Sequence, residues 1–236
     1  MTTAKTRTKG LLSRFWRVTK RVFLALFILQ FVYIFLLKWV DPPITLTQLG
    51  SLLAGDGLKR TYVSLKDISP NARLAVISSE DQLFPDHDGF DFKNIEKAMK
   101  HNQHSKSLHG ASTISQQVAK NVFLWQGRDW FRKGLEVYFT FMIELVWGKR
   151  RILEMYLNVA EMGKGIYGIE AAAHAYYHTT AKNLTRLQAA RIAACLPNPK
   201  VYTVKPLSDH VATRSAWALD QMSHLESDTD IQKLLQ

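Results

Sequence analysis

The longest apolar stretch of the chain runs from Val22 to Leu37 and contains one polar residue, Gln30. Extended through Val40 it covers nineteen residues, and a helix of that length crosses a hydrocarbon core of about 30 Å. A buried core helix and a cleaved signal peptide are the alternatives, but no small-x-small cleavage pattern follows the run. The pattern therefore predicts a single transmembrane helix over residues 22–40.

Beyond the apolar stretch, the hydrophobic positions recur with helical spacing. Residues 41–70 contain Pro42-Pro43 and a Gly-Asp-Gly turn, and they are interpreted as a connector with one short extended piece. Helices are predicted from Asn71 as a cap, through 152–160, over 169–177, and after the Thr185–Gln188 capping box. No βαβ alternation or Gly-rich phosphate loop occurs. The segment 71–236 is therefore predicted to form a mainly α-helical domain.

Charge is distributed unevenly along the chain. The formal net charge is +11, and residues 1–40 contain eight cations and no acid, whereas the remaining 196 residues contain 23 cations and 20 acids. A basic tail over residues 1–21 places the N-terminus in the cytoplasm by the positive-inside rule, and the domain after Asp41 outside. Since most of the excess charge is a topology signal, nucleic acid is not predicted as a partner. The single cysteine, Cys195, forms no intrachain disulfide.

An acidic segment, EDQLFPDHDGFD at 80–91, is the first candidate for chemistry. Pro85 and Gly89 interrupt regular structure, so Glu80 is expected where a helix gives way to a loop. A carboxylate in that position can accept a proton if its pKa is raised. A solvated acidic loop and a cation site are the alternatives that the residues leave open, although the aspartates do not match the calcium-loop spacing.

Polar residues dominate a second segment, GASTISQQVAKN at 110–121. On a helix, Ser112, Gln116 and Lys120 form one stripe, and Thr113, Gln117 and Asn121 form the next. Two stripes of donors ending in a cation suit a ligand with hydroxyls and phosphates, because such groups need many hydrogen bonds and a countercharge. An ordinary solvent-facing helix surface is the alternative.

The third segment places Arg128, Arg132 and Glu136 four residues apart, with Lys133 beside them. Either this is an anion clamp next to a second carboxylate, or Arg132 and Glu136 form an ordinary helical ion pair. The histidines give no credible metal set, because no acid or cysteine completes one. Six apolar residues either dip into the membrane or pack in the core: Phe139, Phe141, Met142, Ile143, Val146 and Trp147.

Taken together, the segments at 80–91, 110–124, 132–136 and 150–177 resemble the peptidoglycan glycosyltransferases of family 51. The resemblance covers roughly residues 72–202. It implies a lysozyme-like helical glycosyltransferase domain without a transpeptidase domain. It also implies polymerisation of lipid II into β-1,4 glycan strands, with inversion at the donor anomeric carbon and release of undecaprenyl diphosphate.

The resemblance also implies roles for individual residues. Glu80 corresponds to the general base that deprotonates the acceptor 4-hydroxyl, Asp81 supports it, and Glu136 corresponds to a second essential acid near the leaving diphosphate. Seven residues correspond to those that hold the sugars and the diphosphate: Ser112, Gln116, Gln117, Lys120, Arg128, Arg132 and Lys133. No cofactor is implied, and a divalent cation is left open, with no metal ligand assigned.

The expected location is the bacterial cytoplasmic (inner) membrane, with one pass and the catalytic domain in the periplasm. Expected partners are lipid II, the growing glycan strand and membrane lipid, and proteins of cell-wall synthesis or division are left open. Two other functions are consistent with the residues: a lysozyme-like lytic enzyme, and a membrane-tethered scaffold for wall assembly.

Overall fold

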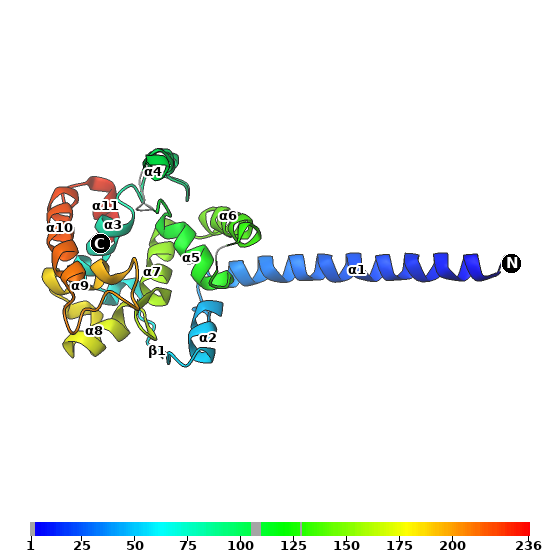
Figure 1. Cartoon of the computed structure of the whole chain (residues 1–236), viewed down its shortest axis with the longest axis horizontal. Coiled ribbons are helices and arrows are strands. Elements are labelled where there is room, and N and C mark those ends of the chain that lie inside the picture. Colours follow the sequence, from blue (N-terminus) through cyan, green and yellow to red (C-terminus); the bar gives the residue numbers. More distant parts are fainter. Residues whose placement is uncertain (1–2, 105–109, 128) are drawn as a thin grey trace. The chain divides into compact units, whose positions relative to one another are not determined.

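The structure is a computed structural model that describes residues 3–104, 110–127 and 129–236. It divides into two compact units, Met1–Val40 and Asp41–Gln236. The elements in chain order are α1 (Thr3–Leu36), α2 (Leu46–Leu53), β1 (Lys59–Arg60), η1 (Leu65–Asp67), α3 (Pro70–Glu80), α4 (Phe92–His104), α5 (Ile114–Phe123), α6 (Trp130–Val146), α7 (Lys149–Val159), β2 (Glu161–Gly163), β3 (Ile166–Tyr167), α8 (Ile169–Tyr177), η2 (Ala181–Asn183), α9 (Arg186–Cys195), α10 (Asp209–Leu225) and α11 (Thr229–Leu235). The prediction of a mainly α-helical protein is confirmed (Figure 1).

Helix α1 contains the predicted apolar stretch. Among the described residues, one segment is long and apolar enough to cross a membrane, Ser13–Leu36. The helix begins earlier than predicted, because Lys, Arg and Leu before Val22 are good helix formers and continue it. It ends at Leu36 rather than Val40. Asp41 precedes Pro42, and a residue before proline disfavours helical backbone, so the helix does not extend into the second unit.

Residues 41–70 have more structure than a connector with one extended piece. Helix α2 begins with a capping box in which Thr45 accepts from Gln48 N–H and the Gln48 side chain accepts from Thr45 N–H. The extended piece is β1, which pairs in parallel with β3, and β3 pairs antiparallel with β2. The sequence pattern did not predict α2 because this helix is short and lies between residues that interrupt regular structure. Its packing against α5 is a tertiary contact, which a local pattern does not reveal.

The core of the second unit lies between two groups of packed helices. Helices α3, α9 and α10 contact one another, and α5 packs against α6 and α7 (Figure 1). The apolar seam of α5 is buried at Ile114, Val118 and Val122, as the spacing predicts. The C-terminal end of α3 meets the N-terminal end of α5 where the two groups join, and Ile114 N–H donates a hydrogen bond to Asp81 there.

The helix caps explain where the elements near that junction begin. The predicted Thr185–Gln188 capping box is present at α9. The predicted cap Asn71 is wrong: Ser69 caps α3 and accepts from Asn71 N–H, and Pro70 occupies the first turn, where its missing N–H costs nothing. Helix α5 is capped by Thr113, which forms a capping box with Gln116.

Candidate active site

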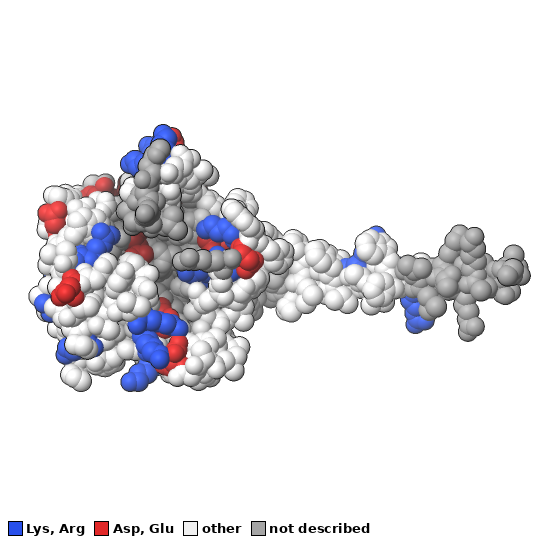
Figure 2. Space-filling model, in the orientation of Figure 1, with Lys and Arg blue, Asp and Glu red and all other residues white. Residues whose placement is uncertain are grey.

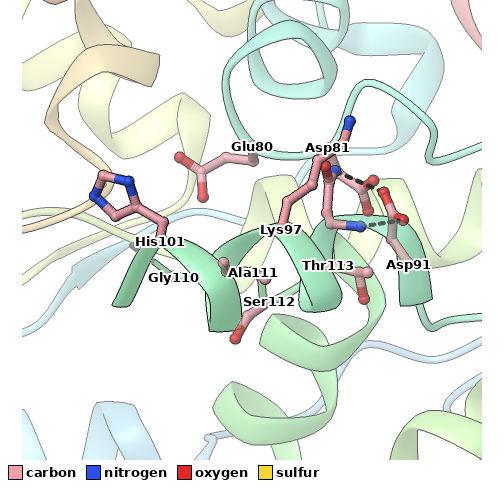
Figure 3. A pocket seen from close by; sticks show the side chains of 11 residues that line it. Glu80, Asp81, Asp91, Lys97, His101, Gly110, Ala111, Ser112 and Thr113 are labelled. Carbon is pink, nitrogen blue, oxygen red and sulfur yellow. Dashed lines mark hydrogen bonds between the residues drawn. The ribbon is translucent and has the colours of Figure 1, made fainter. Parts of the chain in front are cut away.

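A groove crosses the second unit at the junction of α3 and α5. Its first part is a cavity of about 390 Å³. Glu80 and Asp81 reach it from the end of α3, and Lys97 and His101 line it from α4, as Figure 3 shows. The groups from α3 and α4 thus surround one space, although 17 positions separate Glu80 from Lys97 in the sequence.

The second part is a cavity of about 690 Å³ between α5 and α6. It shares Gly110 and Ser112 with the first, so the two parts are continuous. A third part of about 250 Å³ shares Gln117 and Lys120 with the second. Acidic and basic side chains gather around the hollow in this face of the unit (Figure 2). The groove is therefore long and polar, as an extended polyhydroxylated ligand requires.

Glu80 is the last residue of α3 and is half-buried. Its Oε2 accepts a hydrogen bond of 2.7 Å from Gln117 Nε2. Burial raises the pKa of Glu80, against the opposing effects of this bond and of Arg214 and Lys120. Desolvation disfavours the charged carboxylate, so the pKa of Glu80 is shifted in the direction that favours general acid–base chemistry.

A second hydrogen bond orients Gln117. Tyr156 Oη on α7 donates to Gln117 Oε1 over 3.1 Å. Burial raises the pKa of Tyr156 well above its ordinary value, so the phenol keeps its proton and can donate. With its carbonyl held by Tyr156, the Gln117 amide directs its N–H toward Glu80. Gln117 therefore fixes the position of the Glu80 carboxylate.

Asp81 lines the first cavity and also holds the framework of the site. Its Oδ2 accepts from Ile114 N–H over 2.9 Å, and both carboxylate oxygens lie 3.0–3.1 Å from His87 Nε2. The side chain is buried. Asp81 thus connects the end of α3 to the first residue of α5, and it stabilises the N-terminal end of that helix.

The loop after Asp81 packs tightly against α6. Gly89 has φ +88, and a Cβ there would lie 2.8 Å from Thr140 Cγ2 and 2.9 Å from Glu144 Cγ. Thr113 Oγ1 donates to Gly89 O over 2.7 Å. Ser115 donates to Glu144, so its hydroxyl serves the framework. These contacts fix the loop relative to α5.

Glu136 lies on the opposite wall of the groove with two cations. Arg132 Nη1 is 2.7 Å from Glu136 Oε2, and Lys133 Nζ is 2.5 Å from Oε1. Both Arg132 and Glu136 are buried, whereas Lys133 is partly exposed. The predicted ion pair is present, and the same residues line the second cavity, whereas the anion clamp stays a prediction. Arg132 Nε is buried and has no hydrogen-bond partner among the described residues.

Lys120 connects the two walls electrostatically. Burial lowers its pKa, Glu136 and Glu80 act in the opposite direction, and Arg132 and Lys133 add to the lowering. Lys120 lines the second and third cavities. Lys120 therefore interacts electrostatically with both Glu80 and Glu136. A negatively charged ligand would lie between these two glutamates.

The remaining predicted residues differ in their placement. Ser112 precedes α5 instead of lying on a helical stripe, but it lines both large cavities. Gln116 is buried, and its Oε1 accepts from Thr113 N–H, so the capping box uses part of the amide that the sequence assigned to a ligand. Arg128 lies outside the described residues. The predicted stripes begin too early, because Thr113 is the N-cap of α5 and Ser112 precedes it.

Two of the histidines considered from the sequence, His174 and His178, lie at the C-terminal end of α8. His174 Nε2 lies 2.8 Å from Glu170, and His178 ends α8 in a left-handed conformation. Within the described ranges there is no group of three or more His, Cys, Asp or Glu side chains that could hold a metal ion.

Comparison with known proteins shows the family to which this chain belongs. Residues 47–223 match the protein family described as Transglycosylase. The chain belongs to the transglycosylase family. It is 48% identical over 209 residues to the biosynthetic peptidoglycan transglycosylase of Aeromonas hydrophila, covering 87% of this chain and 89% of that protein. The proteins of the same description from Haemophilus influenzae and Yersinia pseudotuberculosis are each 46% identical, and the matches cover at least 91% of both chains in each pair.

Membership of the transglycosylase family confirms the prediction from the four sequence segments. Two residues next to the site escaped that prediction. Tyr156 was assigned to an apolar helix face, although a buried tyrosine hydroxyl needs a partner and could have indicated one. Arg214 lies on α10, far along the chain from every segment considered, and only the fold brings it close to Glu80.

Proposed function

We propose that the chain polymerises lipid II into β-1,4 glycan strands, with inversion at the donor anomeric carbon and release of undecaprenyl diphosphate. The observation that carries the proposal is one groove with a half-buried glutamate of raised pKa in one part and a glutamate held by two cations in the next. The first suits deprotonation of a hydroxyl, and the second suits a leaving diphosphate.

In the proposed reaction, the Glu80 carboxylate takes the proton of the acceptor 4-hydroxyl. The hydroxyl oxygen forms a bond to C1 of the donor sugar as the bond between C1 and the diphosphate oxygen breaks. The leaving diphosphate takes the electron pair of that bond. Its negative charge is stabilised by Lys120, Arg132 and Lys133, which are already in place and so cost little reorganisation. Glu136 holds the last two in position.

A comparison of two substrates tests this function against a lytic one. The full chain in detergent micelles is incubated either with labelled lipid II or with finished peptidoglycan. We expect long glycan strands from lipid II and no fragments from finished peptidoglycan, because the cation cluster suits a diphosphate leaving group. Release of fragments without polymer would make the chain a lytic enzyme instead.

The pH dependence of the rate follows from the raised pKa of Glu80. A general base works only when deprotonated, and burial keeps this carboxyl protonated to a higher pH than the 4.5 of an ordinary glutamate. The rate of polymerisation should therefore fall as the pH drops through the raised pKa, and this acid limb should lie above the range of an exposed glutamate. Initial rates measured from acidic to neutral pH test this expectation, and a flat profile would contradict it.

The apolar composition of α1 and the basic residues before it indicate where the reaction takes place. We propose that α1 anchors the chain in the cytoplasmic membrane, with the basic N-terminus inside and residues after Asp41 in the periplasm. A substrate with a lipid tail supports this arrangement, since its diphosphate lies at the membrane surface. A periplasm-dependent reporter fused after Pro43 is expected to be active, and activity of a cytoplasm-dependent reporter at that position would reverse the topology.

Helix α6 offers an apolar surface next to the cation cluster. Of the six apolar residues considered from the sequence, five lie on α6 and Trp147 is its C-cap. Met142, Ile143 and Trp147 are buried, whereas Phe141 is 58% exposed. Trp130 and Phe131, just before Arg132, are 93% and 72% exposed. We propose that these exposed rings contact the bilayer, because aromatic side chains favour the interface and the adjacent cations suit lipid phosphates.

A further inference from the structure

Arg214 is a charged residue on α10 that is held against the end of α3. Its guanidinium lies over the Trp217 ring, 3.4 Å from the ring centroid. Its Nη2 donates to Ser79 O over 3.4 Å, and Ser79 immediately precedes Glu80 in the chain. The stacking and the hydrogen bond together fix the guanidinium next to the peptide from which Glu80 projects.

Arg214 and Glu80 interact electrostatically, and each changes the pKa of the other. Burial lowers the pKa of Arg214, and among the described residues Glu80 is the one charged group that counters this effect. Conversely, Arg214 opposes the rise in the pKa of Glu80 and does so more strongly than Lys120. Arg214 is thus a half-buried arginine that is coupled electrostatically to one carboxylate, that of Glu80.

We propose that Arg214 is a positioning residue that fixes the end of α3 and favours the ionised, base form of Glu80. The inference rests on the proposed function, in which Glu80 accepts the proton of the acceptor hydroxyl. Arg214 is absent from the residues that line the three parts of the groove within the described chain, so it acts through Glu80 and not by touching the substrate.

Several groups face Glu80 from the elements around it. Asp81 is the chain neighbour of Glu80 and disfavours its charged form. The charge of Glu80 contributes to the raised pKa of Tyr156 on α7 and of Cys195 on α9. Helix α5 supplies Gln117 and Lys120. Lys120 is shared with Glu136, whereas Arg214 is not. When a diphosphate engages Lys120, Arg214 remains as the cation that favours a charged Glu80.

The experiment compares pH profiles of polymerisation for the wild type and Arg214→Met, using the full chain and labelled lipid II. Methionine keeps the length of the side chain and its helix propensity but removes the charge. We expect the acid limb to move to higher pH, so that the rate on the limb falls about three- to tenfold while the high-pH plateau stays within about twofold of wild type. Arg186→Met is the matched control, because Arg186 pairs with exposed Glu226 on the surface, and its limb should not move.

Arg214→Lys separates the charge from the shape. It keeps the cation but loses the planar stacking on Trp217, and we expect its acid limb to lie close to that of the wild type. A limb displaced equally in the Lys and Met variants would overturn the proposal. A uniform loss of rate at every pH, or a change confined to the KM for lipid II, would also overturn it.

A spectroscopic titration makes the inference independent of turnover. The infrared carbonyl band of protonated Glu80 is identified by its loss in Glu80→Gln, and its midpoint should move to higher pH in Arg214→Met. An unmoved midpoint would contradict the role of Arg214 even in an active enzyme. If the wild type makes no glycan from lipid II, the proposed function fails, whereas a moved midpoint would still support the coupling.

Discussion

Replacing Glu80 by Gln should reduce the initial rate of lipid II polymerisation by about 10²- to 10⁴-fold, which is the usual contribution of a general base. The amide has nearly the same shape, and its oxygen can still accept from Gln117, so the fold and substrate binding should be retained. Rates at saturating lipid II, binding of labelled lipid II and the Tm of the variant together measure this. The loss should appear in the chemical step and not in binding.

Glu226→Gln is the matched control for that variant. It makes the same chemical change on the surface, where Glu226 pairs with Arg186, and it should leave the rate unchanged. If Glu80→Gln polymerises lipid II at the wild-type rate, Glu80 is not the base. A membrane-tethered scaffold would then be the better description, since such a role does not require this carboxylate.

Replacing Glu136 by Gln should lower the rate of polymerisation by about 10²-fold or more, because the two cations lose the carboxylate that places them. Arg132 would lose the only ion pair that it makes among the described residues, and its guanidinium is buried. A drop in Tm is also expected, since removing one partner of a buried pair leaves the other charge uncompensated. Rates and Tm measured on the same preparations separate the two effects.

Glu170→Gln controls for the loss of stability. Glu170 is also buried, accepts from Ala181 N–H and contacts His174, and it does not line the groove among the described residues. It should lower Tm while leaving the rate per folded molecule unchanged. If Glu136→Gln loses rate only in proportion to its folded fraction, Glu136 has a structural role and the proposed placement of the diphosphate is wrong.

Local patterns in the sequence predicted those parts of the fold that depend on neighbouring residues. The apolar segment within α1, the capping box at Thr185 and the buried seam of α5 all arise from spacing within one element. Helix α2 escaped prediction because it is short and owes its stability to packing against α5. A helix of eight residues is marginal by itself in water, and the Thr45–Gln48 capping box is the local signal that could have indicated it.

The candidate site shows the same division. Glu136 with Arg132 and Lys133 is a set of neighbours on one helix, and their spacing placed them together. The neighbours of Glu80 come from α5, α7 and α10, so the Tyr156–Gln117–Glu80 chain of hydrogen bonds required the fold. Gln116 both forms the capping box and lines the second cavity, and the sequence pattern did not reveal the capping role. The roles of Glu80, Asp81, Glu136 and the groove residues stay predictions.

The proposed reaction fixes a stoichiometry that one assay can measure. Lipid II labelled separately in its sugar and in its lipid is converted by the full chain, and the two products are counted together. We predict one undecaprenyl diphosphate released for each β-1,4 bond formed, because the C1–oxygen bond breaks as the new bond forms. Released lipid diphosphate without a matching glycosidic bond, or no release at all, would contradict glycan polymerisation in this groove.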